Sequence, residues 1–392
     1  MKKFDLLLIA RPDHSYKIYQ GLKKSDIKFK YFSFKLFPSW FRHIIKHKKM
    51  RTVEGGTSIC NVLSIVSVLK HNLRIGMFQK VSEYDIFEKF IHRKLKHYEG
   101  KIVHYWPCFS YKEIKAYKET HKEAITIAEI YFPCHQWVLD EIGPMLKELG
   151  YGNNLDYIYK EAEMYEETMK FEQNFIVPSE FVAETYRKYY PNKNYFVLPF
   201  GIFKSPSYHK KDYILKEHKF KFVYVGRISI EKGCDLLLNY FQTHTEYELT
   251  IIGSILESEA KFFNKYKNIP NITFMGLVPN TEVPNIAAKC DIGIHLSRFD
   301  AYSLAVGEVI GSGLPVIVSS ETGNCSDVEK YEWGCVTKLD EESIENAIKK
   351  ITNIDNYNSY VDNIDKYLNE NNSTYSQQIV ALYKSILKNG RI

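Results

Sequence analysis

The chain has 392 residues, a length that suggests two or three domains of ordinary size. Hydrophobic residues make up 45% and charged residues 26%, a balance that fills a sizeable core. No run approaches the roughly 18 apolar residues that span a bilayer, and the seven cysteines are scattered without a C-x-x-C pair. A membrane-spanning segment, a disulfide framework and a zinc site are therefore not expected. The apolar run at 4–10 contains Asp5 and lacks a cleavage pattern, which favours a buried strand over a signal peptide and places the protein in the cytoplasm.

Charge is distributed unevenly along the chain. Residues 1–54 carry fourteen Lys and Arg against four acids, a balance of +10, which leaves −4 for the remainder of a chain whose total is +6. The N-terminal end could therefore meet an anionic partner.

Two series of short apolar runs alternate with helix-like segments such as 154–172 and 179–190. Several runs are too continuously apolar for a sheet wetted on one face, and they suit parallel strands covered by helices on both faces. The alternation predicts an α/β fold of doubly wound domains. The first series of expected strands is 4–10, 29–34, 101–105, 124–128 and 174–177, and the second is 220–225, 248–252, 272–274, 292–296 and 316–318.

A break between the two series marks a domain boundary. Pro and Gly interrupt both strand and helix at 199–201, the interruption continues through 205–207, and a new strand begins at Phe220. We place the boundary at about 201–212, which divides the chain into an N-terminal domain, 1–205, and a C-terminal domain, 206–371.

A glycine-rich loop follows the first strand of the second series. Gly226 allows backbone N–H groups to approach an anion, Arg227 can fork onto phosphate oxygens, and Lys232 can add a second positive charge before Gly233. An ordinary loop with solvated basic residues explains the same pattern, and both interpretations stay open at this point. The loop is not a P-loop, because it lacks G-x-x-x-x-G-K-[ST].

A second segment carries two acids eight residues apart, Asp300 and Glu308. If a helix begins near Ser303, Asp300 lies in the loop ahead of it, and free N–H groups at Ser303 and Leu304 can meet a phosphate. Taken alone, the segment is more simply interpreted as a helix with two unrelated acids.

The combination of motifs is more specific than any one of them. In chain order they are G-R-x4-K-G at 226–233, Ile-Gly-Ser at 252–254, Phe-Met-Gly at 274–276, Asp-x7-Glu at 300–308 and Gly-Leu-Pro-Val-Ile at 313–317. Their order and spacing resemble the C-terminal domain of retaining GT-B glycosyltransferases of the family-4 kind, also called glycosyl transferases group 1. The resemblance covers about 174–345, with further landmarks at 177–181 and 198–201.

The resemblance implies two Rossmann-like domains facing a cleft, with a C-terminal helix of about 372–392 crossing back to the N-terminal domain. It implies that Gly226, Arg227, Lys232, Ser303 and Leu304 hold the diphosphate of a UDP- or GDP-type sugar donor. Glu308 becomes the ribose-binding acid and Asp300 the acid that faces the donor sugar. Asp300 replaces the commoner Glu, and 301–303 reads Ala-Tyr-Ser where the family has Gly-Phe-Gly. These departures leave the donor sugar undefined.

Three N-terminal residues are candidates for the acceptor side of the cleft. His104 closes the expected strand 101–105, where such enzymes often have a histidine, and Glu129 and His135 follow the next strand. Each is also compatible with a purely structural role.

A basic aromatic segment covers 28–42 and continues to 47–49. Aromatic rings interleaved with cations fit contact with an anionic membrane surface. A strand with lysines in water explains the pattern equally well, and binding of nucleic acid is not expected.

The leading hypothesis is a retaining hexosyltransferase of cell-envelope polysaccharide synthesis, acting on a glycan or lipid-linked acceptor, with the donor phosphate assisting deprotonation of the acceptor hydroxyl. No metal and no cofactor is expected, because no Asp-x-Asp motif is present and the cations and helix N-terminus can stabilise the leaving diphosphate. The alternatives are a non-catalytic GT-B subunit that stabilises a partner transferase, and a GT-B enzyme that epimerises or phosphorolyses.

Overall fold

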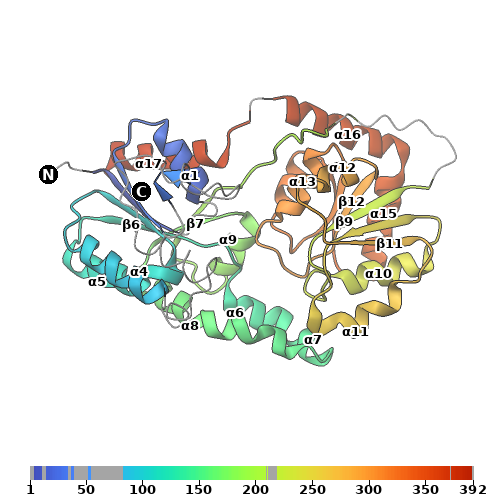
Figure 1. Ribbon diagram of the computed structural model, residues 1–392, viewed down its shortest axis with the longest axis horizontal. Helices are drawn as coiled ribbons and strands as arrows, with labels where there is room; N and C mark the ends of the chain where they lie inside the picture. Colours follow the sequence, from blue (N-terminus) through green and yellow to red (C-terminus); the bar gives the residue numbers. More distant parts are fainter. Residues whose placement is uncertain are drawn as a thin grey trace.

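A computed structural model gives the fold and describes residues 4–10, 15–33, 37–38, 52–53, 83–208, 210, 219–370 and 372–390. Two six-stranded parallel sheets form separate halves of the molecule, and helices flank each sheet (Figure 1). The predicted α/β class with two doubly wound domains is confirmed.

The first sheet has the order β2-β1-β5-β6-β7-β8, with every neighbouring pair parallel. Its strands are β1 (Leu6–Ile9), β2 (Phe29–Phe32), β5 (Ile102–Tyr105), β6 (Ile125–Glu129), β7 (Asn174–Val177) and β8 (Asn194–Val197). The accompanying helices are α1 (Ser15–Lys23), α4 (Glu83–Leu95), α5 (Pro107–Thr120), α6 (His135–Trp137), α7 (Gly143–Glu148), α8 (Asp156–Phe171) and α9 (Glu180–Arg187). A small separate pair, β3 (Phe37–Pro38) and β4 (Thr52–Val53), completes the described strands of this half.

The second sheet has the order β11-β10-β9-β12-β13-β14 and is also parallel throughout. Its strands are β9 (Lys221–Val225), β10 (Glu248–Ile252), β11 (Ile272–Gly276), β12 (Ile292–His295), β13 (Val316–Ser319) and β14 (Gly334–Thr337). The helices are α10 (Cys234–Thr243), α11 (Ala260–Phe263), α12 (Val283–Ala287), α13 (Leu304–Gly311), α14 (Cys325–Lys330), α15 (Glu341–Thr352) and α16 (Ile354–Asn369). The strand order reverses between β9 and β12, the point where doubly wound sheets bind ligands at their carboxyl ends.

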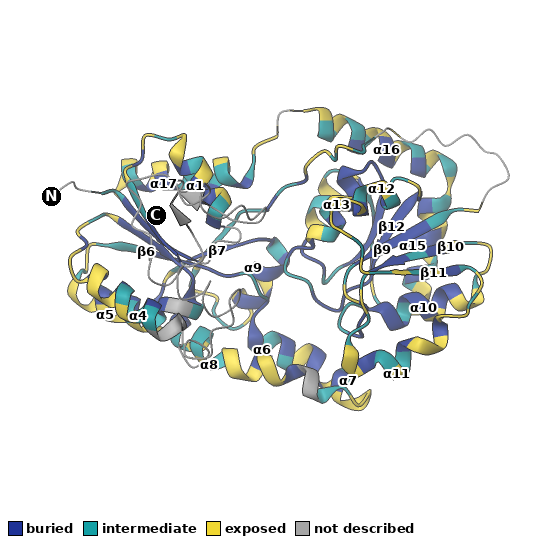
Figure 2. Cartoon of the chain, viewed as in Figure 1, coloured by how far each residue is buried: buried dark blue, intermediate teal, exposed yellow. Residues whose placement is uncertain are grey.

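Burial explains why the apolar runs became parallel strands. Every residue of β1, β5, β12 and β13 is buried, so these strands are covered on both faces (Figure 2). A strand covered on both faces has no solvent side, and its sequence is therefore mostly apolar, with a polar residue only near its carboxyl end.

The last helix, α17 (Tyr375–Asn389), packs beside α1 of the first half, whereas α16 belongs to the second half (Figure 1). The Cβ of a residue replacing Gly21 of α1 would lie 2.9 Å from the Ser376 Cβ, so the two helices approach closely. The helix expected at about 372–392 therefore crosses back, as the resemblance implied. We propose the same division, 1–205 with this helix and 206–371, as the domain boundaries.

Candidate active site

The loop between β9 and α10 is shaped by its two glycines. Gly226 has φ +149° and Gly233 has φ +67°, a left-handed conformation that favours glycine. A Cβ on Gly233 would lie 1.7 Å from the Leu296 carbonyl oxygen, just beyond β12. The second glycine of the motif therefore lets the start of α10 approach the end of β12, which brings Lys232 to the segment that follows β12.

Lys232 is the centre of the site. Its Nζ donates to Asp300 Oδ2 at 2.9 Å and to the Phe299 carbonyl at 3.3 Å, and it lies 3.5 Å from Glu231 Oε1. Burial by itself would lower the pKa of Lys232, but the carboxylates of Asp300 and Glu231 outweigh it, so the pKa is raised. Lys232 therefore stays charged, and the structure unites two predicted residues that are 68 positions apart.

Glu231 is a site residue that sequence reasoning missed. Its carboxylate lies 3.3 Å from Arg227 Nη2 as well as close to Lys232. It also faces the first half of the molecule, because it lines one pocket with Tyr131 and Phe132. Burial and then the Glu231 carboxylate raise the pKa of Tyr157 on α8. Arg227 is about half exposed, so its guanidinium is accessible to a ligand.

Asp300 lies in the loop ahead of α13, where its backbone forms an isolated parallel β-bridge with Thr322. Ser303 caps the helix, since its Oγ accepts from the Val306 N–H, and its own N–H donates to Asn324 Oδ1 at 2.7 Å. The expectation of a free N–H at Ser303 is therefore wrong, because the Asn324 side chain uses it. Within the described residues, the N–H groups of Leu304 and its successor Ala305 have no hydrogen-bond partner, and they form the positive end of the helix.

Glu308 lies one turn further along α13 and is exposed. Partial burial of its carboxyl group raises its pKa. In the described part of the chain no hydrogen bond or ion pair engages this carboxylate, which leaves it available to accept from a ligand hydroxyl.

A buried ion pair holds the two loops of the site together. Arg298 donates to both carboxylate oxygens of Asp235 on α10, at 2.7 and 2.8 Å, and also to the Ile230 carbonyl. Both side chains are about one-tenth exposed. Because Arg298 precedes Asp300 by two residues and Asp235 follows Lys232 by three, this pair fixes the relative position of the Lys232–Asp300 pair. Sequence reasoning missed it.

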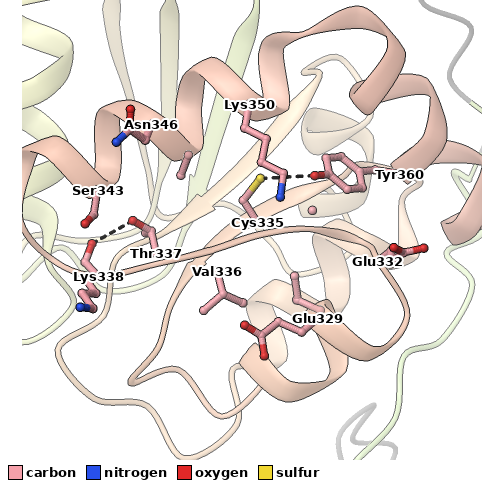
Figure 3. Close-up of a pocket in the computed structure, with 13 residues that line it drawn as sticks. Glu329, Glu332, Cys335, Val336, Thr337, Lys338, Ser343, Asn346, Lys350 and Tyr360 are labelled. Carbon is pink, nitrogen blue, oxygen red and sulfur yellow. Dashed lines mark hydrogen bonds between the residues drawn. The ribbon is translucent and has the colours of Figure 1, made fainter.

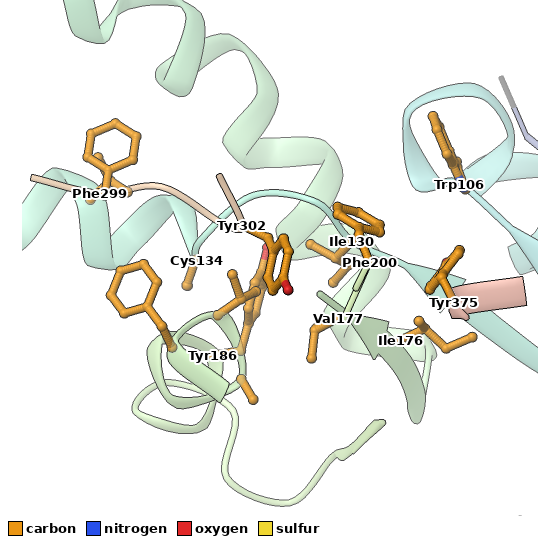
Figure 4. Close-up of a cluster of buried hydrophobic side chains, with 14 of the residues drawn as sticks. Trp106, Ile130, Cys134, Ile176, Val177, Tyr186, Phe200, Phe299, Tyr302 and Tyr375 are labelled. Atoms are coloured by element: carbon orange, nitrogen blue, oxygen red, sulfur yellow. The ribbon is translucent and has the colours of Figure 1, made fainter. Parts of the chain in front are cut away.

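A pocket of about 200 Å³ opens beside Lys232 and Asp300, between the two halves of the molecule. Figure 4 shows Phe200 between Tyr302 and Tyr375, with ring centroids 5.5 and 5.3 Å away, and Phe299 further along the same junction. Lys232, Asp300 and Leu304 are the predicted site residues that line it. The complete lining is Tyr131, Phe132, Pro133, Phe200, Glu231, Lys232, Phe299, Asp300, Ala301, Tyr302 and Leu304.

His104 was predicted to face this cleft as a catalytic residue, and its predicted orientation is wrong. The side chain is fully buried, with Nδ1 2.5 Å from the Tyr383 hydroxyl and Nε2 3.0 Å from Glu129 Oε2. Glu129 is also buried, and it accepts from Trp106 Nε1 at 2.8 Å and from the Tyr375 hydroxyl. Both residues point at α17, because the helix that crosses back covers this end of the sheet with Tyr375 and Tyr383.

His135 is likewise buried rather than displayed to the cleft. Its ring stacks on Tyr165 of α8 with a centroid distance of 4.4 Å, and Nε2 lies 3.7 Å from Glu161. The Phe132 ring lies 4.9 Å from it and lines the pocket in its place.

A further histidine, His295 at the end of β12, lies beneath the site. It is buried against the Tyr224 ring at 5.3 Å, and burial lowers its pKa to about 4. His295 is therefore neutral at physiological pH.

A larger hollow of about 550 Å³ lies along β14, remote from these residues (Figure 3). Glu329, Cys335, Lys350 and Tyr360 line it, and it includes none of the predicted site residues. Among the described residues, no helix is long and apolar enough to cross a bilayer. No cluster of His, Cys, Asp and Glu within that part of the chain is arranged to hold a metal ion.

The second half of the chain matches a family of known proteins. Residues 208–371 match the family described as glycosyl transferases group 1. An uncharacterised 41.2 kDa protein in the cps region of Klebsiella pneumoniae is 30% identical over 108 residues, which are 27% of this chain and 29% of that protein. A GDP-mannose-dependent alpha-mannosyltransferase of Corynebacterium glutamicum is 29% identical over 94 residues, 24% of this chain and 22% of that protein. The matches thus span about a quarter of these relatives.

The fold of the whole chain also has known counterparts. The structure of a sucrose-phosphate synthase from Thermosynechococcus elongatus superposes with a TM-score of 0.64 at 13% identity, covering 98% of this chain and 100% of that one. Two parallel sheets in this arrangement form the GT-B fold that the sequence predicted. The chain has the GT-B fold, and its residues 208–371 are similar to the family described as glycosyl transferases group 1.

Proposed function

We propose that the protein is a glycosyltransferase that moves a sugar, with retention, from a UDP- or GDP-type nucleotide-sugar to a glycan or lipid-linked acceptor. The observation that carries the proposal is the Lys232–Asp300 pair, with Nζ and Oδ2 2.9 Å apart, in the lining of the pocket between the two halves. A cation for a diphosphate and an acid for a sugar hydroxyl lie side by side there. The family match of residues 208–371 supports the same reaction class.

In this proposal the donor diphosphate binds Lys232, Arg227 and the free N–H groups at the start of α13. Asp300 accepts from a hydroxyl of the donor sugar, and Glu308 accepts from the ribose. The acceptor oxygen bonds to the anomeric carbon while the bond from that carbon to the phosphate oxygen breaks. The acceptor proton passes to the leaving diphosphate on the same face, which gives retention. The protein contributes orientation and positive charge, so the proposal requires no metal.

Two substitutions test the site directly. Arg227→Ala and Glu308→Ala are expected to abolish donor turnover while the melting temperature stays unchanged, because both side chains lie at the surface of the protein. Lys261→Ala is the matched control, since Lys261 is an exposed lysine of α11 outside the site. An unchanged rate in either site variant would remove the assignment.

The alternative is a non-catalytic GT-B subunit that stabilises a partner transferase. Glu231 gives it some support, because two acids balance the two cations of the site and weaken its attraction for a diphosphate. Isothermal titration with UDP and GDP separates the two functions, since such a subunit need bind neither. Product analysis after incubation with donor alone tests for epimerisation or phosphorolysis.

We further propose a cytoplasmic location at the inner face of the cell membrane and a role in envelope polysaccharide synthesis. The position of the Klebsiella relative in a cps region supports the role. The basic aromatic segment supports the location, although 34–36 and 39–51 lie outside the described residues. Its described part, β2, is an edge strand in which Tyr31 and Phe32 are buried and Lys30 lies over the Phe4 ring.

A further inference from the structure

The wall that the first half contributes to the cleft pocket is aromatic. Tyr131, Phe132, Pro133 and Phe200 form it. The Tyr131 and Phe200 ring centroids are 5.8 Å apart, and the Phe132 ring meets Phe299 of the opposite wall edge-on at 5.6 Å. These contacts hold the rings in fixed orientations, so the wall offers a firm apolar surface to a ligand.

All charged residues that line the pocket belong to the other wall. They are Glu231, Lys232 and Asp300, and the one cation among them already faces both acids. Behind the aromatic wall there is an acid as well, because Glu129 accepts from Trp106 Nε1 at 2.8 Å and the Trp106 ring lies 4.5 Å from the Tyr131 ring. In the described part of the chain, the aromatic wall therefore supplies no positive charge to a ligand.

This distribution of charge disfavours a phosphorylated acceptor. A phosphate group is recognised by Arg, Lys or a row of backbone N–H groups, and a buried charge without such partners carries a large desolvation penalty. Against this wall a phosphate would find no cation among the described residues and would face the carboxylates of Asp300 and Glu231. The cations of the site, Lys232 and Arg227, lie on the donor side.

An uncharged sugar ring fits the wall better. The C–H groups on one face of a pyranose carry partial positive charge and pack against the negative face of an aromatic ring. The pocket of about 200 Å³ is smaller than the roughly 300–1,000 Å³ of sites that enclose a whole drug-sized ligand. It therefore suits one acceptor ring against the aromatic wall, with the rest of the acceptor outside and the donor sugar reaching only Asp300 at the opposite wall.

We propose that the acceptor presents an uncharged glycosyl ring to Tyr131, Phe132 and Phe200, and that sugar phosphates are not acceptors. This inference rests on the proposed glycosyltransferase function and narrows its acceptor class. The proposed acceptor class would distinguish this chain from the structural relative named as a sucrose-phosphate synthase, although the two folds superpose.

The test compares two classes of acceptor with one donor. The donor is whichever of UDP-glucose, UDP-galactose and GDP-mannose raises the melting temperature most and is hydrolysed without acceptor. Methyl glucosides, galactosides and mannosides are compared with glucose 6-phosphate and fructose 6-phosphate by nucleotide release and product mass. Because an unpaired buried charge is costly, neutral glycosides are expected to react at least about tenfold faster. Faster reaction of the sugar phosphates, or product from neither class, would overturn the inference.

Binding and hydrolysis of the donor are measured first, so failure of the proposed function is seen separately and also ends this inference. Phe132→Ala is then expected to raise the KM for the neutral acceptor about three- to tenfold, with the Kd for the nucleoside diphosphate unchanged. Phe132→Tyr should restore the KM, and Tyr159→Ala, an exposed aromatic of α8, is the control. An unchanged KM in Phe132→Ala contradicts the proposed ring contact.

Discussion

Lys232→Met should weaken nucleotide binding, whereas Asp300→Asn, in the other member of the pair, should not. Replacing Lys232 with Met removes a charge-assisted hydrogen bond to the diphosphate, worth about 1.5–3 kcal/mol, which corresponds to a roughly 10- to 150-fold weaker Kd. It also leaves Asp300 and Glu231 without the cation that now lies 2.9 and 3.5 Å away, so their repulsion adds to the loss. Asp300→Asn does the reverse. It frees Lys232 for the diphosphate, and the Kd should stay equal or decrease while transfer is lost.

The assay is isothermal titration of UDP and GDP, without a sugar, into the wild type and both variants. Lys261→Met controls for removal of a lysine elsewhere on the surface. Salt dependence adds a second readout, because the Lys232→Met variant loses charge attraction that salt screens. A Kd unchanged by Lys232→Met, or weakened equally by both substitutions, would refute the assignment of Lys232 to the diphosphate.

Three further predictions concern stability and surface binding. Arg298→Ala should lower the free energy of unfolding by about 3–5 kcal/mol, because it leaves a buried carboxylate unpaired. Arg187→Ala, which breaks an exposed pair, should cost about 0–1 kcal/mol, and equal urea midpoints would contradict this contrast. Burial lowers the pKa of His295 from 6.5 to about 4. Between pH 6.5 and about 4 the unfolded chain therefore binds a proton that the folded chain does not, and the free energy of unfolding should decrease as the pH falls through this range. His295→Phe should show a shallower loss over the same range, and identical pH profiles would count against this account. The protein should bind anionic vesicles more than neutral ones, with binding that weakens as salt rises, and equal binding to both would exclude the membrane contact.

Most of the sheet framework could be predicted from the sequence, because buried parallel strands are continuously apolar. The range 174–177 coincides with β7, and the remaining expected strands agree with the observed ones to within two residues at each end. β8 and β14 were missed for the same physical reason. Both are edge strands in which exposed or half-buried residues are frequent, so their sequences lack the apolar run.

The site was predictable where it depends on local spacing and not where it depends on distant packing. The positions of the loop 226–233 and of the N-terminus of α13 follow from the motifs, because each depends on residues that are close together in the sequence. The orientation of His104 depends on Tyr383, a residue 279 positions away, and no local pattern encodes that contact. Glu231 occupies one of the four unspecified positions of the G-R-x4-K-G motif, so the motif assigned no role to its carboxylate.

The crossing helix has a consequence for how the chain is made. Tyr375 and Tyr383 complete the polar interior around Glu129 and His104, so the half of the molecule that is synthesised first lacks part of its core until almost the whole chain has been translated. Until then a carboxylate and an imidazole at the end of its sheet remain exposed to water, whereas the strands and helices of 219–370 can already assemble around their own core. The half that is synthesised second is therefore expected to finish folding first. Released chains truncated after residue 370 should accordingly be cleaved by protease within the N-terminal sheet and resist cleavage in the C-terminal one.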